Sequence, residues 1–240
     1  MGYHKITATD AVEAGVLVAE EIASAKDEMS AHAFRELFMA EPSEDEGNPF
    51  GVSHIRACIA PQSAGEPAVW GWDLAKRQDY TVGIALDAAG YVCRFERFQH
   101  IPWDEILNRI VSTTGRTPAL VDSTGVGDPI VDFLQKKPGT QFEGYHFSPA
   151  SKQKLMEGLA VAIQSRNVTY PDGVIVQELE QFEYEYTRLN VRYSAPEGGF
   201  DDCVIALSLA VMHKATATRP LHITQTMVDE ILRAPRRRAY

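Results

Sequence analysis

Acidic residues at three separate positions have the chemistry of a metal site. Asp73 ends the motif Trp-Gly-Trp-Asp, Asp122 lies in Leu-Val-Asp-Ser-Thr-Gly, and the pair Asp201 and Asp202 opens Asp-Asp-Cys-Val-Ile-Ala-Leu. Carboxylate oxygens are the hard ligands that Mg²⁺ and Mn²⁺ prefer. If the fold brings these acids together, they form in outline a site for metal-assisted cleavage of phosphodiester bonds.

Each of these acids also has an ordinary structural explanation. Asp73 and Asp122 each follow a predicted strand, where Asp commonly forms a turn. Asp201 and Asp202 precede an apolar helix, where a carboxylate caps the helix and interacts favourably with its dipole. The glycines after Asp122 allow the backbone to approach a phosphate or a neighbouring element closely. Taken one at a time, the acids therefore do not distinguish ligands from turns and caps.

The elements that must position these acids form a predicted mixed sheet. Short strands at about 69 to 74, 81 to 87 and 91 to 99 have short connections, which implies an antiparallel meander. Helices and strands then alternate at about 103 to 112, 119 to 122, 128 to 135, 142 to 147 and 152 to 166. This order predicts an α/β fold with a mixed sheet flanked by helices. Because its first strand lies beside the strand after the first helix, Asp73 and Asp122 become neighbours.

The two ends of the chain differ from this central region. An amphipathic helix is predicted at about 10 to 28, with Asp10 and Glu13 as a capping box, and a second helix contains Phe34, Leu37 and Phe38. Beyond the sheet, the pattern predicts a strand and turn, a helix, a strand and a final helix at about 168 to 173, 174 to 184, 187 to 193 and 201 to 214. We therefore divide the chain into three segments: a helical arm and linker (1–65), the main domain (66–215) and a basic, flexible tail (216–240).

Composition limits the class of protein. The 240 residues include 33 acidic and 23 basic side chains, a net charge of −10, which ordinarily argues against a nucleic-acid partner. Metal ligands and a local cluster of basic residues can still reconcile that charge with DNA. Cys58, Cys93 and Cys203 show neither disulfide nor zinc spacing, which favours a reducing cytosol. No signal segment or long apolar run is present, so we expect no membrane role and no secretion.

The motifs together closely resemble those of one known family. They are Gly-Trp-Asp-Leu at Asp73, Val-Asp-Ser-Thr-Gly-Val-Gly-Asp-Pro at Asp122, Ser-Pro-Ala-Ser-Lys ending at Lys152, and Phe-Asp-Asp-Cys-Val-Ile-Ala-Leu at Asp202. Residues 30 to 215, approximately, resemble the nuclease domain of the large terminase subunit of tailed bacteriophages, which has a ribonuclease H and RuvC-like fold. The usual His before the final acidic pair is replaced here by Phe200.

This resemblance implies a metal-dependent endonuclease that cuts concatemeric viral DNA during genome packaging. Asp73, Asp122 and Asp202 would be catalytic and would bind two divalent cations, Mg²⁺ or Mn²⁺, with Asp201 as a further ligand, helper or helix cap. Two such ions could generate the attacking hydroxide and stabilise the departing 3′ oxygen.

The resemblance also suggests partners. Lys152, Lys154 and Arg77 are candidates for contact with double-stranded DNA. A solvated position at the start of a helix is the alternative for both lysines, and it is favoured more for Lys154 than for Lys152. A phage portal, a small terminase subunit and an ATPase motor domain are the further partners expected, in the host cytoplasm. The sequence contains no Gly-x-x-x-x-Gly-Lys-Ser/Thr loop, so we expect the motor's ATPase to be absent from this chain and residues 1–50 to be linker and motor edge.

Three alternative functions remain open from the sequence. A RuvC-like resolvase or another ribonuclease H-like nuclease would use the same acids. An actin-like or sugar-kinase-like phosphotransferase shares the architecture, but such enzymes usually need a duplicated domain, and the sequence shows no repeat. A non-catalytic module that docks on a portal would need the acids only for structure, and it predicts no metal-dependent cleavage.

Overall fold

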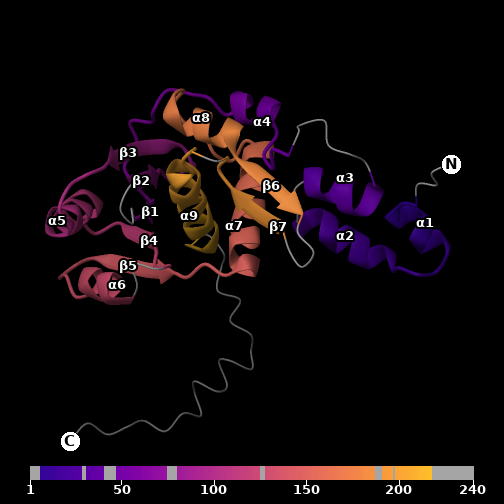
Figure 1. The fold of residues 1–240 in the computed structure, drawn as a ribbon, viewed down its shortest axis with the longest axis horizontal. Coiled ribbons are helices and arrows are strands. Elements are labelled where there is room, and N and C mark those ends of the chain that lie inside the picture. The colour runs from indigo at the N-terminus through magenta and orange to yellow at the C-terminus, as the bar shows by residue number, and fades with distance from the viewer. Residues whose placement is uncertain are drawn as a thin grey trace, which may run out of the picture.

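A five-stranded mixed sheet in the order β3-β2-β1-β4-β5 forms the centre of the molecule (Figure 1). Its strands are β1 (Val69–Asp73), β2 (Thr81–Leu86), β3 (Val92–Phe98), β4 (Pro118–Asp122) and β5 (Gln141–Tyr145). β1, β2 and β3 pair antiparallel, whereas β4 is parallel to both β1 and β5. The predicted α/β fold, with antiparallel strands followed by parallel ones, is confirmed.

The computed structural model describes most of the chain, with gaps at and between the elements. The described residues are 6–28, 31–40, 47–74, 80–124, 128–186, 191–196 and 198–217. The predicted basic tail beyond residue 217, residues 41–46 of the predicted arm and linker, and Arg77 therefore lie outside the described residues.

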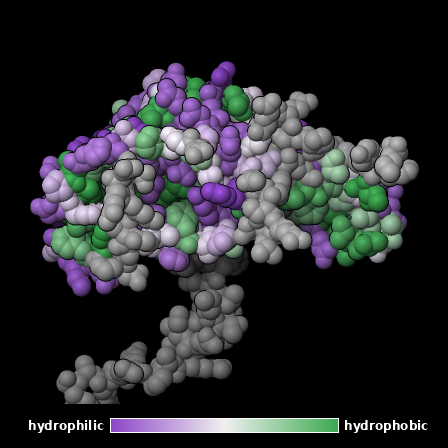
Figure 2. Space-filling view, in the orientation of Figure 1, coloured by the Kyte–Doolittle hydropathy of each residue, from purple (hydrophilic) through white to green (hydrophobic). Residues whose placement is uncertain are grey.

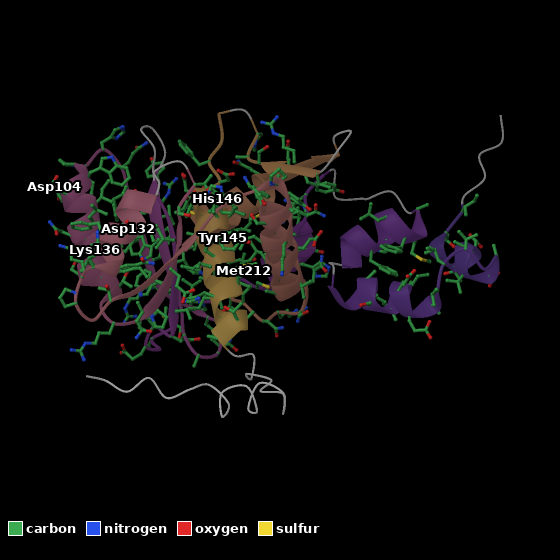
Figure 3. All side chains as sticks on the ribbon, turned by 90° about the horizontal axis from the view of Figure 1, so that it is seen from below. Asp104, Asp132, Lys136, Tyr145, His146 and Met212 are labelled. Carbon is green, nitrogen blue, oxygen red and sulfur yellow. The ribbon has the colours of Figure 1, made fainter. Side chains whose placement is uncertain are left out.

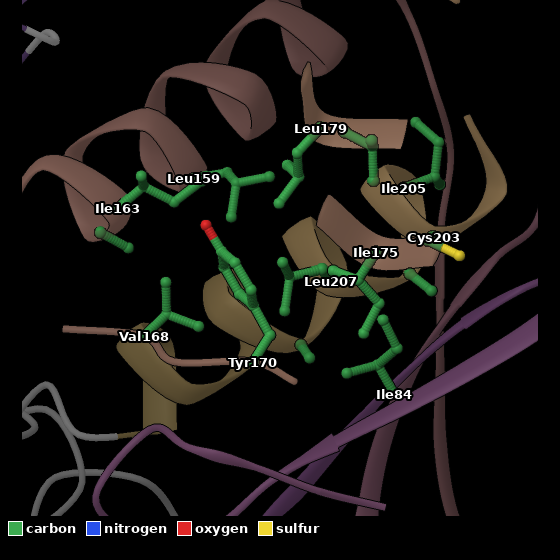
Figure 4. Packing of buried hydrophobic residues seen from close by; sticks show 14 of the residues in the cluster. Ile84, Leu159, Ile163, Val168, Tyr170, Ile175, Leu179, Cys203, Ile205 and Leu207 are labelled. Carbon is green, nitrogen blue, oxygen red and sulfur yellow. The ribbon is translucent and has the colours of Figure 1, made fainter. Parts of the chain in front are cut away.

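Helices cover both faces of the sheet. On one face pack α7 (Pro149–Gln164), α8 (Val174–Gln181) and α9 (Asp202–Ala217), and on the other lie α5 (Trp103–Thr114) and α6 (Asp128–Gln135). Side chains such as Ile84 of β2, Leu159 of α7 and Leu207 of α9 meet in the larger apolar core (Figure 4). Strand β1 is buried along its whole length because both of its faces are covered.

The close approach of α9 to β1 depends on one glycine. A Cβ atom at Gly71 would overlap the backbone carbonyl oxygen of Ala206 and the backbone nitrogen of Ala210. Without a side chain at this position, the helix lies directly on the strand. The N-terminal end of α9 is thereby held over the sheet beside the end of β1, where Asp73 lies.

The N-terminal arm differs from its prediction. Instead of one helix over about 10 to 28, the structure has α1 (Ala8–Glu13) and α2 (Ala19–Glu28), followed by α3 (Ala31–Met39), which contains the predicted Phe34, Leu37 and Phe38. The break coincides with Gly15, whose φ of 72° is left-handed. The predicted Asp10 and Glu13 capping box is wrong, because Thr7 is the N-cap and Asp10 its reciprocal partner. Figure 2 shows apolar side chains exposed on this arm.

Several boundaries in the second half of the chain also shift. Helix α7 begins at Pro149 because Ser148 provides the N-cap and Pro is well suited to the first helical position. The predicted helix to residue 184 ends earlier, since Phe182 is already extended, and β6 (Glu183–Tyr186) pairs antiparallel with β7 (Val191–Ser194). Helix α9 extends to Ala217.

The segment that precedes the sheet, residues 47–65, packs against the second half of the chain. Helix α4 (Val52–Ala57) contributes Ile55 to the larger core, and Phe50 stacks on Phe182. The Asn48 side-chain amide donates three hydrogen bonds, and its oxygen accepts two from backbone N–H groups. The accepting carbonyls are those of Leu179, Glu180 and Phe182, and the donors are Phe50 and Gly51. Residues 47–65 thus pack on the sheet domain, while our division of the chain at residue 65 stays a prediction.

Candidate functional site

The predicted acidic residues come from three different elements that meet at one end of the sheet. Asp73 is the last residue of β1 and Asp122 the last residue of β4, and these two strands run parallel and side by side. Asp202 is the first residue of α9, which packs against β1 and β4. Because parallel strands end at the same edge, acids that are distant in sequence become neighbours.

A cavity of about 310 Å³ lies where these elements meet. Its lining residues are Asp73, Leu74, Asp122, Thr124, Phe147, Lys152, Asp201, Asp202 and Ile205. All four acids predicted from the sequence line it, and so does Lys152. Lys154 is exposed on α7 and does not line the cavity, and Arg77 lies outside the described residues.

The acids are buried, although they are charged groups. Asp73, Asp122 and Asp202 are 9%, 8% and 6% exposed. Burial raises the pKa of Asp73 well above its ordinary value, and the charges of Asp122, Asp202 and Asp201 raise it further, whereas Lys152 lowers it. Buried carboxylates that repel one another in this way are stabilised by a cation, so the electrostatics of the cavity suit a positively charged ligand.

Local hydrogen bonds hold Asp122 and the loop after β4. The Asp122 Oδ1 atom accepts a hydrogen bond from the Thr124 backbone N–H at 2.6 Å. The Thr124 hydroxyl oxygen in turn accepts one from the Phe147 backbone N–H at 2.7 Å. The turn that follows Asp122 is therefore tied to the segment that leads into α7, and Lys152 is in the first turns of that helix.

The two final acids have different environments. Asp201 precedes α9, and its carbonyl oxygen accepts the Ile205 N–H at 2.9 Å, as an N-cap residue does. Its carboxylate lies 3.6 Å from the Lys152 Nζ atom. The Asp202 Oδ2 atom accepts a hydrogen bond from the Tyr80 backbone N–H at 3.3 Å. Asp201 is thus paired with a cation, while Asp202 is the more buried member of the pair.

The ligand chemistry of this cavity fits a divalent cation. Its charged oxygen atoms are all carboxylate oxygens, which suit Mg²⁺ or Mn²⁺ and are poor ligands for softer metals. Among the described residues, no three His, Cys, Asp or Glu side chains already form a closed set of metal ligands. The carboxylates nevertheless line one cavity, in which they could hold a cation in common.

Sequence reasoning missed several cavity residues. Thr124 follows Asp122 in Asp-Ser-Thr-Gly, and a hydroxyl so near an acid was an available signal. Phe147 falls at the end of the strand predicted at about 142 to 147, and Ile205 falls within the apolar helix predicted at about 201 to 214. Nothing in their local pattern marks them, because only the packing of α7 and α9 brings them to the cavity.

The opposite face of the sheet has acids of another kind. Figure 3 shows Asp104 on α5 and Asp132 on α6, away from α7 and α9. Both are exposed to solvent. They therefore lack the burial that raises the pKa of Asp73, and their substitution provides controls for experiments on the cavity.

A mixed sheet of this order, with acids at the ends of its two central parallel strands and on the helix packed over them, defines a ribonuclease H-like protein. The chain belongs to the Terminase RNaseH-like domain family, whose profile matches residues 70–214, more than half of the 240 residues. The resemblance found from the sequence motifs is thereby confirmed. A comparison with curated proteins finds no match.

Solved structures with this fold include phage terminase nucleases. The large terminase nuclease from thermophilic phage G20c is 26% identical, with a TM-score of 0.61, over 69% of this chain and 98% of that one. The same nuclease with bound magnesium is 26% identical, with a TM-score of 0.61, over 71% and 98%. The nuclease domain from Thermus phage P74-26, at 24% identity and a TM-score of 0.56, covers 66% and 92% and shares the fold.

Family and structural likeness together support a phage large-terminase nuclease. Within the part of the chain that the structure describes, no helix has the length and apolar character needed to cross a membrane.

Proposed function

We propose that this chain is a divalent-metal-dependent endonuclease that cuts concatemeric viral DNA during genome packaging. One observation supports the proposal above all: carboxylates from β1, β4 and α9 line a single cavity together with Lys152. Membership of the terminase family and the magnesium bound in the related G20c nuclease point in the same direction.

In this proposal Asp73, Asp122 and Asp202 hold two ions, Mg²⁺ or Mn²⁺, and Asp201 is an additional ligand or helper. Such ions, when bound, activate a water molecule and stabilise the departing 3′ oxygen. The protein's own contribution is to bring the carboxylates together in a buried position, where their charge acts on the bound ions and the DNA phosphate. The rigid elements β1, β4 and α9 suit this role.

Lys152 is proposed to bind the phosphate that is cut. Lys152 lines the cavity, and its Nζ atom lies 3.6 Å from the Asp201 carboxylate, which would keep it near the acids before DNA arrives. Lys154 and Arg77 are proposed to contact the DNA backbone outside the cavity. Portal, small terminase subunit and ATPase motor are the proposed partners of the complete packaging machine.

The deciding experiment is incubation of the purified chain with supercoiled plasmid and Mn²⁺ or Mg²⁺. We expect nicking and linearisation that EDTA abolishes and that Asp122→Ala reduces at least about 100-fold, because charge stabilisation by bound metal is worth several kcal/mol. Asp104→Ala, which removes an exposed acid on the opposite face, is the matched control and should retain full activity. Intact plasmid with both metals, or undiminished cleavage by Asp122→Ala, would refute the proposal.

A further inference from the structure

An ion pair between Arg97 and Glu178 lies outside the cavity lining, with Glu178 buried and Arg97 partly buried. Arg97 of β3 places its Nη2 atom 3.3 Å from the Glu178 Oε1 atom of α8, and Glu178 is only 5% exposed. Burial raises the pKa of Glu178, while hydrogen bonds from Cys203 and the charge of Arg97 act in the opposite direction. Because desolvation often cancels the attraction within such a pair, stability alone explains it poorly.

Glu178 acts as a helix cap supplied from another element. Its Oε2 atom accepts the Cys203 backbone N–H at 2.7 Å, and its Oε1 atom lies 3.2 Å from the Cys203 sulfur. Backbone N–H groups in the first turn of a helix have no partner within the helix, and a carboxylate there also interacts favourably with the helix dipole. Cys203 directly follows Asp202. Glu178 thereby fixes the first turn of α9, which contains Asp202.

Arg97 also acts on Asp202 indirectly, through Tyr80. Its guanidinium carbon lies 3.4 Å from the centre of the Tyr80 ring, a cation–π contact. Tyr80 also packs edge-on against Phe200, at 5.2 Å between ring centres. The backbone N–H of Tyr80 donates to the Asp202 Oδ2 atom at 3.3 Å. Stacking of Arg97 on the ring therefore restrains the residue that binds the Asp202 carboxylate.

We infer that Glu178 and Arg97 are positioning residues for Asp202. Glu178 fixes the first turn of α9, and Arg97 fixes Tyr80, whose backbone N–H donates to the Asp202 carboxylate. This inference rests on the proposed function of Asp202 as a metal ligand. Partners that orient metal ligands typically change metal affinity 10- to 100-fold when they are mutated. Neither residue lines the cavity, so neither is expected to touch metal or DNA.

The test is Mn²⁺ binding to the purified chain, measured by calorimetry, together with the Mn²⁺ dependence of plasmid cleavage. Glu178→Gln preserves shape but removes the charge opposite Arg97. We expect its Kd for Mn²⁺, and the Mn²⁺ concentration for half-maximal cleavage, to rise about 10-fold or more. At saturating Mn²⁺ the rate should return to within a few-fold of wild type, with an unchanged KM for plasmid.

A second variant and a matched control make the test specific. Arg97→Lys retains the charge next to Glu178 but loses the planar contact with Tyr80, so it should also weaken Mn²⁺ binding. Glu96→Gln removes the charge from a neighbouring Glu–Arg pair, Glu96 with Arg109 at 2.7 Å, on the other face of the sheet. This control should leave Mn²⁺ affinity unchanged.

The outcomes separate this inference from the proposed function. A wild-type chain that neither binds Mn²⁺ nor cuts plasmid contradicts the proposed function itself. A wild-type chain that does both, with Glu178→Gln and Arg97→Lys matching its Mn²⁺ affinity, overturns only the positioning roles. A lower melting temperature with unaltered affinity has the same consequence, because it shows a purely structural pair. If Glu178→Gln does not fold, Arg97→Lys alone decides.

Discussion

Replacement of Asn48 is expected to destabilise the protein strongly, although this residue is far from the cavity. Asn48 is 5% exposed, and its side chain makes five hydrogen bonds that join the segment before α4 to the end of α8. Asn48→Ala removes all five. Asn48→Asp has nearly the same shape and can still accept from Phe50 and Gly51, but it directs a second oxygen at three carbonyl groups.

The structure sets the size of both effects. In Asn48→Ala the two N–H groups lose their acceptor, and an unpaired buried donor costs about 1–3 kcal/mol, so we expect a loss of about 4 kcal/mol. Asn48→Asp loses both N–H donors of the amide, which serve the three carbonyl groups and are worth about 1 kcal/mol each, and it gains repulsion from those carbonyls, which gives a loss of at least about 2 kcal/mol. Both variants should therefore be far less stable than wild type.

Urea denaturation followed by tryptophan fluorescence measures these losses. Trp70 and Trp72 are buried and stacked, with ring centres 5.2 Å apart, so their signal follows the sheet. Asn108→Ala, at an exposed position on α5, is the matched control and should change stability by less than about 0.5 kcal/mol. A loss below about 1 kcal/mol for both Asn48 variants would show that this network of hydrogen bonds is not important for folding.

Further predictions concern glycines and the acidic cavity. Gly71→Ala places a methyl group against the Ala206 carbonyl and should lower the stability by about 2–3 kcal/mol. Gly158→Ala, at an open position on α7, should raise the stability by about 0.5–1 kcal/mol. Thermal unfolding of both variants measures these changes, and equal effects would contradict the packing argument. Because folding raises the Asp73 pKa, the metal-free protein should lose stability as pH rises above the ordinary Asp value. Asp73→Asn should flatten this dependence between pH 4 and 8, and a wild-type slope in the variant would contradict the electrostatic argument.

Local pattern was sufficient for the sheet and most of its helices. Short apolar strands with short connections predicted the meander of β1 to β3, and helical periodicity predicted α5 and α6, because such segments bury one regular face. The hairpin of β6 and β7 was missed in part. Apolar residues of α8 continue into Phe182 without a glycine or proline, so nothing local marks the end of the helix.

The acids show the same division between local and tertiary information. Residue types and strand ends were enough to select Asp73, Asp122 and Asp202 as candidates, since these features are encoded locally. The sequence favoured Lys152 over Lys154 only slightly. Residues two positions apart on a helix point to different sides, and of these two lysines only Lys152 lines the cavity.

The sequence by itself determined the order of strands and helices and the oxygen-rich chemistry of the candidate site, because periodicity and residue type act over short distances. Only the tertiary structure decided which residues orient the acids of that site. Glu178 is a charged residue on the buried side of α8, which is unusual, but the sequence does not show which residues it contacts. Its contacts with Cys203 and Arg97 join α8, α9 and β3, and only the packing of those elements on one face of the sheet creates them.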